Sequence, residues 1–404
     1  MLGLSTDTVG LPGSSNTAYG PTATSDDLSG LRDHVVLDML VGAEQRWLRC
    51  CRSAVAAGAD AARALFAPRR ETEVLARASL ARWKSLDEDE LLVEEAESPE
   101  GDDRRDTAEL SAARALGALA CALAGVSDAG PAVVRFLAHA ERAGLGSAGS
   151  RSGGDDALFD TGDAELASVL DELSAHRDHP ARDFALLTAL ELAGRRPTTT
   201  RTSEVRVLFV DAYGEGHVAV LRLTQVENGP SGLHPDPARM SFLQADADFR
   251  GALADAWDVS GLTGTGVSVL WSLTLEGGAP ANDISGASSG AAFAVALAYL
   301  LRRGRVIRRR IDPSCAITAG LVGDRLTAVG GYRGKLRAAQ RNSLRVIVAA
   351  ESLDDALDAA PPQFTGRITA ARSLDEAIRD ARIRLDYLVW TAVAALTIAA
   401  LLID

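Results

Sequence analysis

The chain has 404 residues, of which 47% are hydrophobic and 24% are charged, and its formal net charge at pH 7 is −13. A chain of this length can hold two or three domains and bury a sizeable core. The acidic balance argues against nucleic acid as the main partner, because phosphate binding requires clustered positive charge. The four cysteines lack metal-ligand spacing, so the composition predicts no metal or other cofactor.

The first half of the chain is predicted to be helical. Residues 1–25 are rich in Gly, Ser, Thr and Pro, lack the features of a signal peptide and are expected to form a disordered tail. Over residues 26–196, apolar residues recur at intervals of three and four, which predicts a bundle of five or six helices. The helices are expected within residues 36–54, 73–86, 107–126, 131–144, 164–175 and 181–194.

Two segments without this periodicity interrupt the predicted bundle. Residues 87–103 form an acidic run, which is interpreted as a solvated loop or helix end, with docking of a basic partner as the alternative. Residues 146–156 are rich in Gly and Ser and are expected to form a flexible linker within the bundle.

From about residue 203 to residue 383 the sequence predicts an α/β domain. Alternating apolar residues predict a hairpin of strands at 205–209 and 219–223, and a further strand at 266–275. A second hairpin, a helix from Arg333, a strand at 344–349 and a helix at 353–359 follow, and Ser373 begins a capping box that opens a last helix. The predicted fold class is therefore α+β, a helical bundle followed by an α/β domain and a C-terminal transmembrane helix.

A small-residue turn before an apolar helix is the most distinctive local pattern. The turn reads Ser-Gly-Ala-Ser-Ser-Gly over residues 285–290, and alanine-rich sequence predicts a helix from Ala291. Ser288 would lie at a helix N-terminus, where unpaired N–H groups stabilise negative charge. Downstream, Lys335 lies in Gly-Gly-Tyr-Arg-Gly-Lys-Leu with apolar neighbours. A hydroxyl at a helix start and a lysine in an apolar pocket are the components of a Ser-Lys acyl-transfer site.

These motifs, with Cys-Ala-Ile-Thr-Ala-Gly-Leu at residues 315–321 between them, resemble the proteolytic domain of Lon-type serine proteases over residues 203–383, about half of the chain. The resemblance implies that Ser288 is the nucleophile, that Lys335 is its base and that the Thr318 hydroxyl helps to hold the amine. It also implies protein or peptide substrates and allows a homo-oligomer. The sequence has Ser285 where the family usually has an acidic residue, and Ala287 where it usually has proline.

Other interpretations of the same residues remain open. Ser289 carries a hydroxyl in the same turn, and His217 on the first predicted hairpin could suggest a Ser-His triad instead of a Ser-Lys dyad. The Gly-Ala-Ser-Ser-Gly loop also resembles the phosphate loop of GHMP small-molecule kinases. A third alternative is an inactive protease-like module that binds partners through its helical half.

The chain shows no P-loop pattern, so the ATPase module usual in Lon-type proteases is missing and the expected activity is ATP-independent. Residues 387–403 contain no charge, and as a helix they would measure about 25 Å. Arginines precede this segment, and Tyr387 and Trp390 lie near its start. Residues 385–404 are therefore predicted to be a membrane tail anchor that holds the catalytic domain on the cytoplasmic side.

Overall fold

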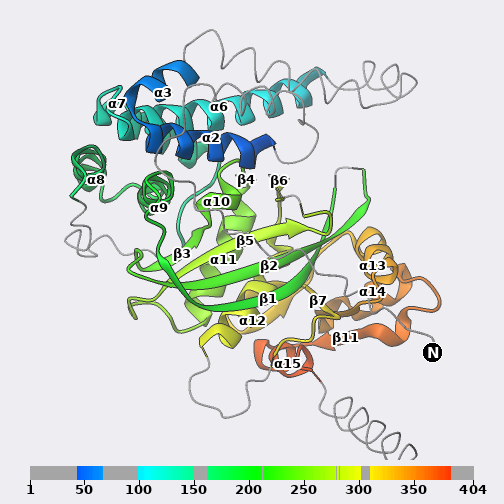
Figure 1. Ribbon diagram of the computed structural model, residues 1–404. Helices are drawn as coiled ribbons and strands as arrows, with labels where there is room; N and C mark the ends of the chain where they lie inside the picture. Colours follow the sequence, from blue (N-terminus) through cyan, green and yellow to red (C-terminus); the bar gives the residue numbers. More distant parts are fainter. Residues whose placement is uncertain are drawn as a thin grey trace, which may run out of the picture.

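A computed structural model describes residues 43–66, 99–149, 162–211, 213–278, 280–281, 283–301 and 310–383 (Figure 1). The predicted tail at 1–25, the predicted helix at 73–86, most of the acidic run and the predicted anchor at 385–404 lie outside these residues. None of the helices that are described has the length and the apolar character needed to cross a membrane.

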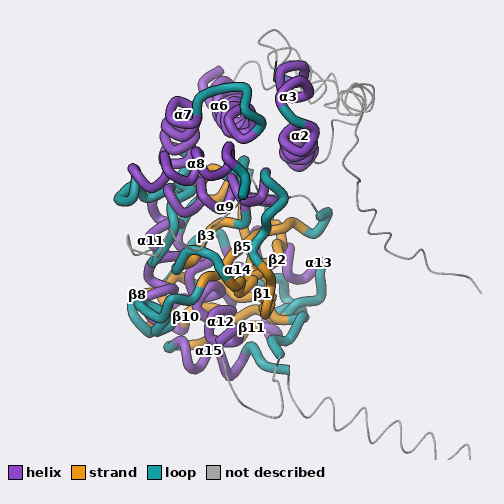
Figure 2. Tube along the Cα trace, turned by 60° about the vertical axis from the view of Figure 1, so that its left-hand side comes forward, coloured by secondary structure: helices purple, strands orange, loops and turns teal. Residues whose placement is uncertain are grey.

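The described part of residues 43–196 is helical, as the periodicity predicts. The helices are α2 (Ala43–Ala57), α3 (Ala59–Leu65), α6 (Pro99–Leu123), α7 (Ala129–Arg142), α8 (Ala164–Ala175) and α9 (Arg182–Leu192). The predicted bounds of α8 are confirmed, and its N-cap Asp163 accepts a hydrogen bond from the Leu166 N–H at 3.0 Å. Trp47 is buried in this part, and its indole N–H donates to the Ala113 carbonyl oxygen. Figure 2 shows these helices gathered on one side of the α/β part.

A seven-stranded mixed sheet forms the centre of the remainder, in the order β11-β10-β7-β1-β2-β5-β3. Strand β2 runs antiparallel to β1, and β5 runs antiparallel to β2. Strands β7, β10 and β11 run parallel to β1. The carboxyl ends of β1, β7, β10 and β11 therefore share one edge of the sheet. The strands are β1 (Thr198–Val210), β2 (Gly216–Glu227), β3 (Gly232–Pro235), β5 (Ser268–Leu275), β7 (Cys315–Thr318), β10 (Arg345–Ala349) and β11 (Ile368–Ala371).

Side-chain alternation along the strands divides the core between the two faces of the sheet. Val205, Val207 and Ile317 belong to the larger cluster, which includes apolar residues of α11 (Ala247–Val259), α12 (Gly290–Leu301) and α15 (Leu374–Asp380). Leu208 and Ala316 belong to a second cluster with α13 (Tyr332–Arg341) and α14 (Leu353–Ala359). Residues one apart on a strand thus face different helices.

Short elements complete the α/β part. They are α10 (Pro237–Met240), the parallel pair β4 (Gln244–Ala245) and β6 (Asp283–Ile284), and the hairpin β8 (Gly320–Val322) and β9 (Arg325–Thr327). Both predicted hairpins are confirmed. The predicted cap of the last helix is also confirmed, since the Ser373 hydroxyl accepts from the Glu376 N–H. Strands β3 and β11 and helix α11 were not predicted from the sequence.

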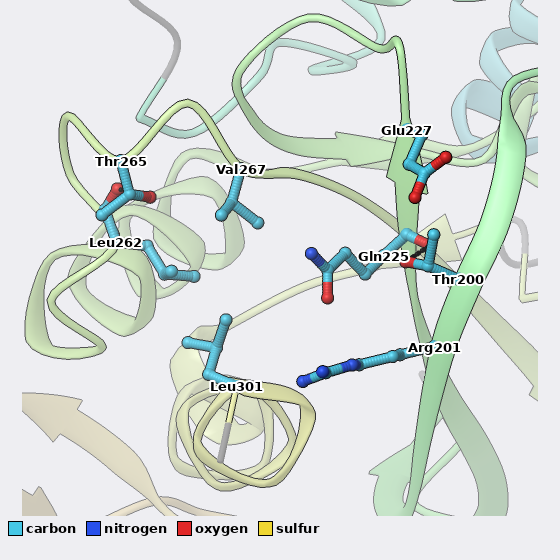
Figure 3. A pocket seen from close by; sticks show the side chains of 8 residues that line it. All are labelled: Thr200, Arg201, Gln225, Glu227, Leu262, Thr265, Val267 and Leu301. Carbon is cyan, nitrogen blue, oxygen red and sulfur yellow. Dashed lines mark hydrogen bonds between the residues drawn. The ribbon is translucent and has the colours of Figure 1, made fainter. Parts of the chain in front are cut away.

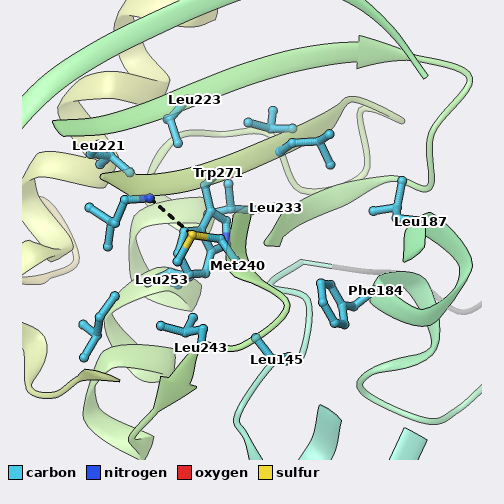
Figure 4. Packing of buried hydrophobic residues seen from close by; sticks show 14 of the residues in the cluster. Leu145, Phe184, Leu187, Leu221, Leu223, Leu233, Met240, Leu243, Leu253 and Trp271 are labelled. Atoms are coloured by element: carbon cyan, nitrogen blue, oxygen red, sulfur yellow. Dashed lines mark hydrogen bonds between the residues drawn. The ribbon is translucent and has the colours of Figure 1, made fainter. Parts of the chain in front are cut away.

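The helical part and the α/β part share one hydrophobic core. Phe184 and Leu145 from the helical part approach Leu233, Met240 and Trp271 from the α/β part (Figure 4). A β-bridge joins Ala148 to Leu233, and the buried ring of His234 lies 2.6 Å from the Ser147 hydroxyl through Nδ1. Packing between the helical part and the α/β part therefore stabilises the fold.

Replacement of Phe293 tests how strongly the larger core depends on its aromatic centre. Phe293 is fully buried on α12 and makes edge contacts with Phe249 and Trp271, at ring-centroid distances of 5.9 and 5.6 Å. Phe293→Ala should lower the free energy of unfolding by about 3–5 kcal/mol in urea denaturation. The exposed control Val322→Ala should change it by less than about 0.5 kcal/mol. A loss below about 1 kcal/mol in Phe293→Ala would contradict this packing.

Candidate active site

The serine turn has the local structure that its small residues predict. Gly286 has a φ of 78°, in the region that L side chains rarely adopt, and this permits the sharp change of direction after β6. A 3₁₀ turn, η2 (Ala287–Ser289), follows and continues directly into α12. Ser288 therefore precedes an apolar helix, most of whose residues are buried.

Two backbone hydrogen bonds join this turn to the carboxyl end of β7. The Ala319 N–H donates to the Ser288 carbonyl oxygen at 3.1 Å, and the Ala291 N–H donates to the Ala319 carbonyl oxygen at 3.2 Å. Ala319 directly follows Thr318, the last residue of β7. The structure thus brings the Ser288 backbone next to the residue that follows Thr318. In open α/β sheets, the carboxyl edge of the strands is the usual place for a ligand.

Asp246 is a third anchor of the turn, and sequence reasoning did not identify it. One carboxylate oxygen accepts from the Phe249 N–H at 2.7 Å and caps α11, while the other accepts from the Gly286 N–H at 2.8 Å. The pairing of β4 with β6 places Asp246 beside this turn. An aspartate three residues before Phe249 could have indicated the helix cap, but no local signal indicates the bond to Gly286, 40 residues further along the chain.

Lys335 lies in the first part of α13, whose backbone packs closely on the β1–β2 hairpin. Gly331 precedes the helix in the left-handed conformation, with φ 77°. A Cβ atom on Gly216 would collide with the Gly334 carbonyl oxygen, and one on Gly334 would collide with the Gly214 carbonyl oxygen. A Cβ on Gly331 would lie 2.8 Å from a Val210 methyl carbon. Glycines therefore allow α13 to approach the carboxyl end of β1.

The Lys335 side chain is buried on α13. Its exposed fraction is 4%, and burial lowers its pKa to about 8 because removal from water disfavours the ammonium form. Thr318 is two residues after Ala316, which packs in the cluster with α13, so alternation places Thr318 on that same face. The Thr318 hydroxyl is fully buried and has no hydrogen-bond partner within the described residues. It is thus a polar group without a partner among the described residues, on the sheet face that α13 covers.

The two serines of the turn differ in accessibility. Ser289 is 1% exposed, and its hydroxyl oxygen is buried without a partner among the described residues. Ser288 is half-buried and reaches solvent. Accessibility therefore favours Ser288 over Ser289 as the residue that meets a substrate. In the described part of the chain no hydrogen bond joins either hydroxyl to the Lys335 amine.

His217 is placed at the edge of the candidate site but does not complete a triad. Its Nε2 lies 3.0 Å from a carboxylate oxygen of Asp211, and the hydrogen bond between them lowers the pKa of Asp211. Asp211 also accepts hydrogen bonds from the N–H groups of Tyr213 and Glu215, so it holds the hairpin turn. No hydrogen bond links His217 to Ser288 in the residues that the structure describes.

No known family model matches the chain, and no curated protein matches it in sequence. The geometry described above is therefore the basis for the functional proposal.

Substitution of Asp246 tests the anchor of the serine turn. Asp246→Ala removes both acceptors, so the amides of Phe249 and Gly286 should both lose protection in hydrogen-exchange measurements, and stability should fall by about 1–2 kcal/mol. Asp246→Asn keeps one oxygen for the helix cap and replaces the other with a donor. It should therefore preserve protection at Phe249 and lose it at Gly286. Unchanged protection at Gly286 in both variants would contradict the anchoring role.

Proposed function

We propose that the chain is an ATP-independent serine peptidase of the Lon-like type, in which Ser288 is the nucleophile and Lys335 is its base. The main support for the proposal is the buried Lys335, whose pKa is lowered to about 8. Its helix, α13, covers the sheet face on which Thr318 lies. The Ser288 turn is bonded to the residue that follows Thr318 at the end of β7. Lys335 forms no ion pair with an acidic residue in the described part of the chain, and a buried lysine in that position is costly for a fold, so it suggests a functional site.

The lowered pKa gives Lys335 the protonation state that a general base needs. At pH 7, about a tenth of an amine with a pKa of 8 is neutral, which is about 300-fold more than for an ordinary lysine. The neutral amine accepts the Ser288 hydroxyl proton while the oxygen attacks the peptide carbonyl carbon. The C–N bond then breaks, and the ammonium returns its proton to the leaving amine. Water, activated by the same amine, hydrolyses the ester and restores the serine.

The surroundings of the pair supply the other requirements of the reaction. The tetrahedral intermediate carries a negative oxygen, and N–H groups of η2 would hold it, because the first amides of a helical turn lack helical partners. The Thr318 hydroxyl, buried without a partner in the described part of the chain, would accept a hydrogen bond from the Lys335 ammonium and fix its position. The half-buried Ser288 leaves the acyl acceptor accessible to an extended substrate.

The sequence resemblance over residues 203–383 supports the same reaction class. It extends the proposal to a peptidase that acts on flexible protein or peptide segments, since the chain lacks a P-loop for an unfolding ATPase. We propose in addition that residues 385–404 anchor the enzyme in a membrane with the catalytic part in the cytoplasm, and that the helical part regulates it or recruits substrates.

Mutation of the pair tests the assignment. Ser288→Ala and Lys335→Met should each reduce cleavage of a fluorogenic unstructured peptide by about a thousandfold or more, because nucleophile and base act as a unit. Ser289→Ala is the matched control and should retain most of the activity. The kinetics are measured with and without ATP, and the rate should be the same. Full activity of Ser288→Ala, strict ATP dependence, or phosphate transfer from ATP to a small molecule would overturn the proposal.

The pH dependence tests the role of the amine. Because only the neutral form of Lys335 accepts a proton, kcat/KM should be low below pH 7, rise about tenfold per pH unit and level off above an apparent pKa near 8. Circular dichroism at each pH serves as the control for folding. A profile that is flat from pH 6 to 9, or one governed by a pKa near 6.5 as for a histidine base, would contradict Lys335 as the base.

A further inference from the structure

A pocket lies at the opposite end of α12 from the serine turn. It has a volume of about 500 Å³, which is within the usual range for ligand sites. Its walls come from the start of β1, the end of β2, the segment after α11 and the end of α12. Leu301 ends α12 eleven residues after Gly290, so the pocket is about 17 Å from the start of that helix. It is therefore separate from the candidate active site.

A β-bulge turns polar side chains toward this pocket. The pairing of β1 with β2 shifts between Thr199 and Arg201, so that Thr200 is the extra residue, and its hydroxyl donates to the Gln225 carbonyl oxygen at 3.1 Å. Arg201 pairs directly with Gln225 across the two strands. Figure 3 shows the side chains of Arg201 and Gln225 extending into the same space, opposite the apolar side chains of Leu262, Val267 and Leu301.

The charged groups of the pocket are not used by the described fold. Neither the Arg201 guanidinium nor the Glu227 carboxylate makes a hydrogen bond or an ion pair with the residues that the structure describes. An arginine fork presents parallel N–H donors that match a carboxylate. One side of the pocket thus offers a carboxylate partner, and the other offers an apolar surface.

The adjoining strand also has a free edge. Strand β1 pairs with β2 along its length, but on its other side it pairs with β7 only at Arg206 and Val207. Among the described strands, residues 198–205 therefore have main-chain groups with no strand beside them. Such an edge accepts an extended peptide by strand addition.

We propose that this pocket binds the C-terminal end of a peptide that has a free carboxylate and an apolar last side chain. The carboxylate pairs with Arg201 and the Gln225 amide, the last side chain contacts Leu262, Val267 and Leu301, and the preceding residues pair along the free edge of β1. A fatty acid shares the carboxylate but fits less well, because the remaining lining residues, Thr200, Thr265 and Glu227, are polar. Binding of the peptide is independent of the proposed peptidase activity. A role of this pocket in recruiting substrates rests on that proposed activity.

The test measures binding to the full chain carrying Ser288→Ala, so that the probe is not cleaved. The probe is a short fluorescein-labelled peptide that ends in leucine with a free carboxylate, and fluorescence anisotropy reports its affinity. Amidation of the C-terminus should weaken binding by about tenfold or more, because it removes the charge that Arg201 pairs with. In the Arg201→Gln variant, the affinity for the free-acid peptide should fall to the affinity that the wild-type arginine gives for the amidated peptide. Arg135→Gln, which changes an exposed arginine on α7, is the matched control and should have no effect.

Three outcomes would overturn the proposal. They are equal affinity for the acid and the amide, unchanged binding by Arg201→Gln, and displacement of a fluorescent fatty acid by free oleate but not by the peptide. Because Arg201 is exposed, its replacement should not affect folding, and a thermal unfolding curve checks this. A failure of peptide cleavage by the wild-type chain would count against the proposed peptidase but would leave this binding result unaffected.

Discussion

The backbone of Ala319 connects the parts of the candidate site. Its N–H donates to the Ser288 carbonyl oxygen and its carbonyl oxygen accepts from the Ala291 N–H, so the residue that follows β7 bonds to both sides of the serine turn. Because β7 lies between β1 and β10, the turn is attached to an interior strand of the sheet. The Asp246 carboxylate adds a second attachment through Gly286. A side chain held at fixed points loses little entropy when a ligand reaches it.

The same strand end accumulates buried polar groups that the described fold does not satisfy. The hydroxyls of Ser289 and Thr318 are buried without hydrogen bonds in the described residues, and the Lys335 ammonium is disfavoured by burial. Each costs stability, since a buried polar group loses its water without gaining a partner. Buried polar atoms without a partner also occur elsewhere in the described fold, including those of Ser268 and Trp257, so these groups support the candidate site only together with its geometry. The close glycine contacts between α13 and the β1–β2 hairpin hold Lys335 in this environment.

Much of the fold could be predicted from local patterns, while long-range relations could not. The periodicity predicted α8 and α14 at their observed bounds, and the small residues before Ala291 predicted the serine turn. Strand β3 has only four residues and ends at Pro235, so it gives no alternating pattern. The Asp246–Gly286 bond and the Arg201 pocket depend on residues that lie far apart in sequence and become neighbours only through strand pairing. The sequence names Ser288, Lys335 and Thr318 as candidate site residues, whereas their burial and their neighbours come from the structure.

Covalent labelling tests the central claim most directly. The wild-type chain is treated with a fluorophosphonate, which reacts with an activated serine hydroxyl, and the modified residue is identified by peptide mass spectrometry. The account predicts a label on Ser288, no label on the buried Ser289, and loss of labelling in Lys335→Met, because without its base the hydroxyl is a poor nucleophile. A label on another residue, or labelling of Ser288 at the same rate in Lys335→Met, would contradict a Ser-Lys dyad in this fold.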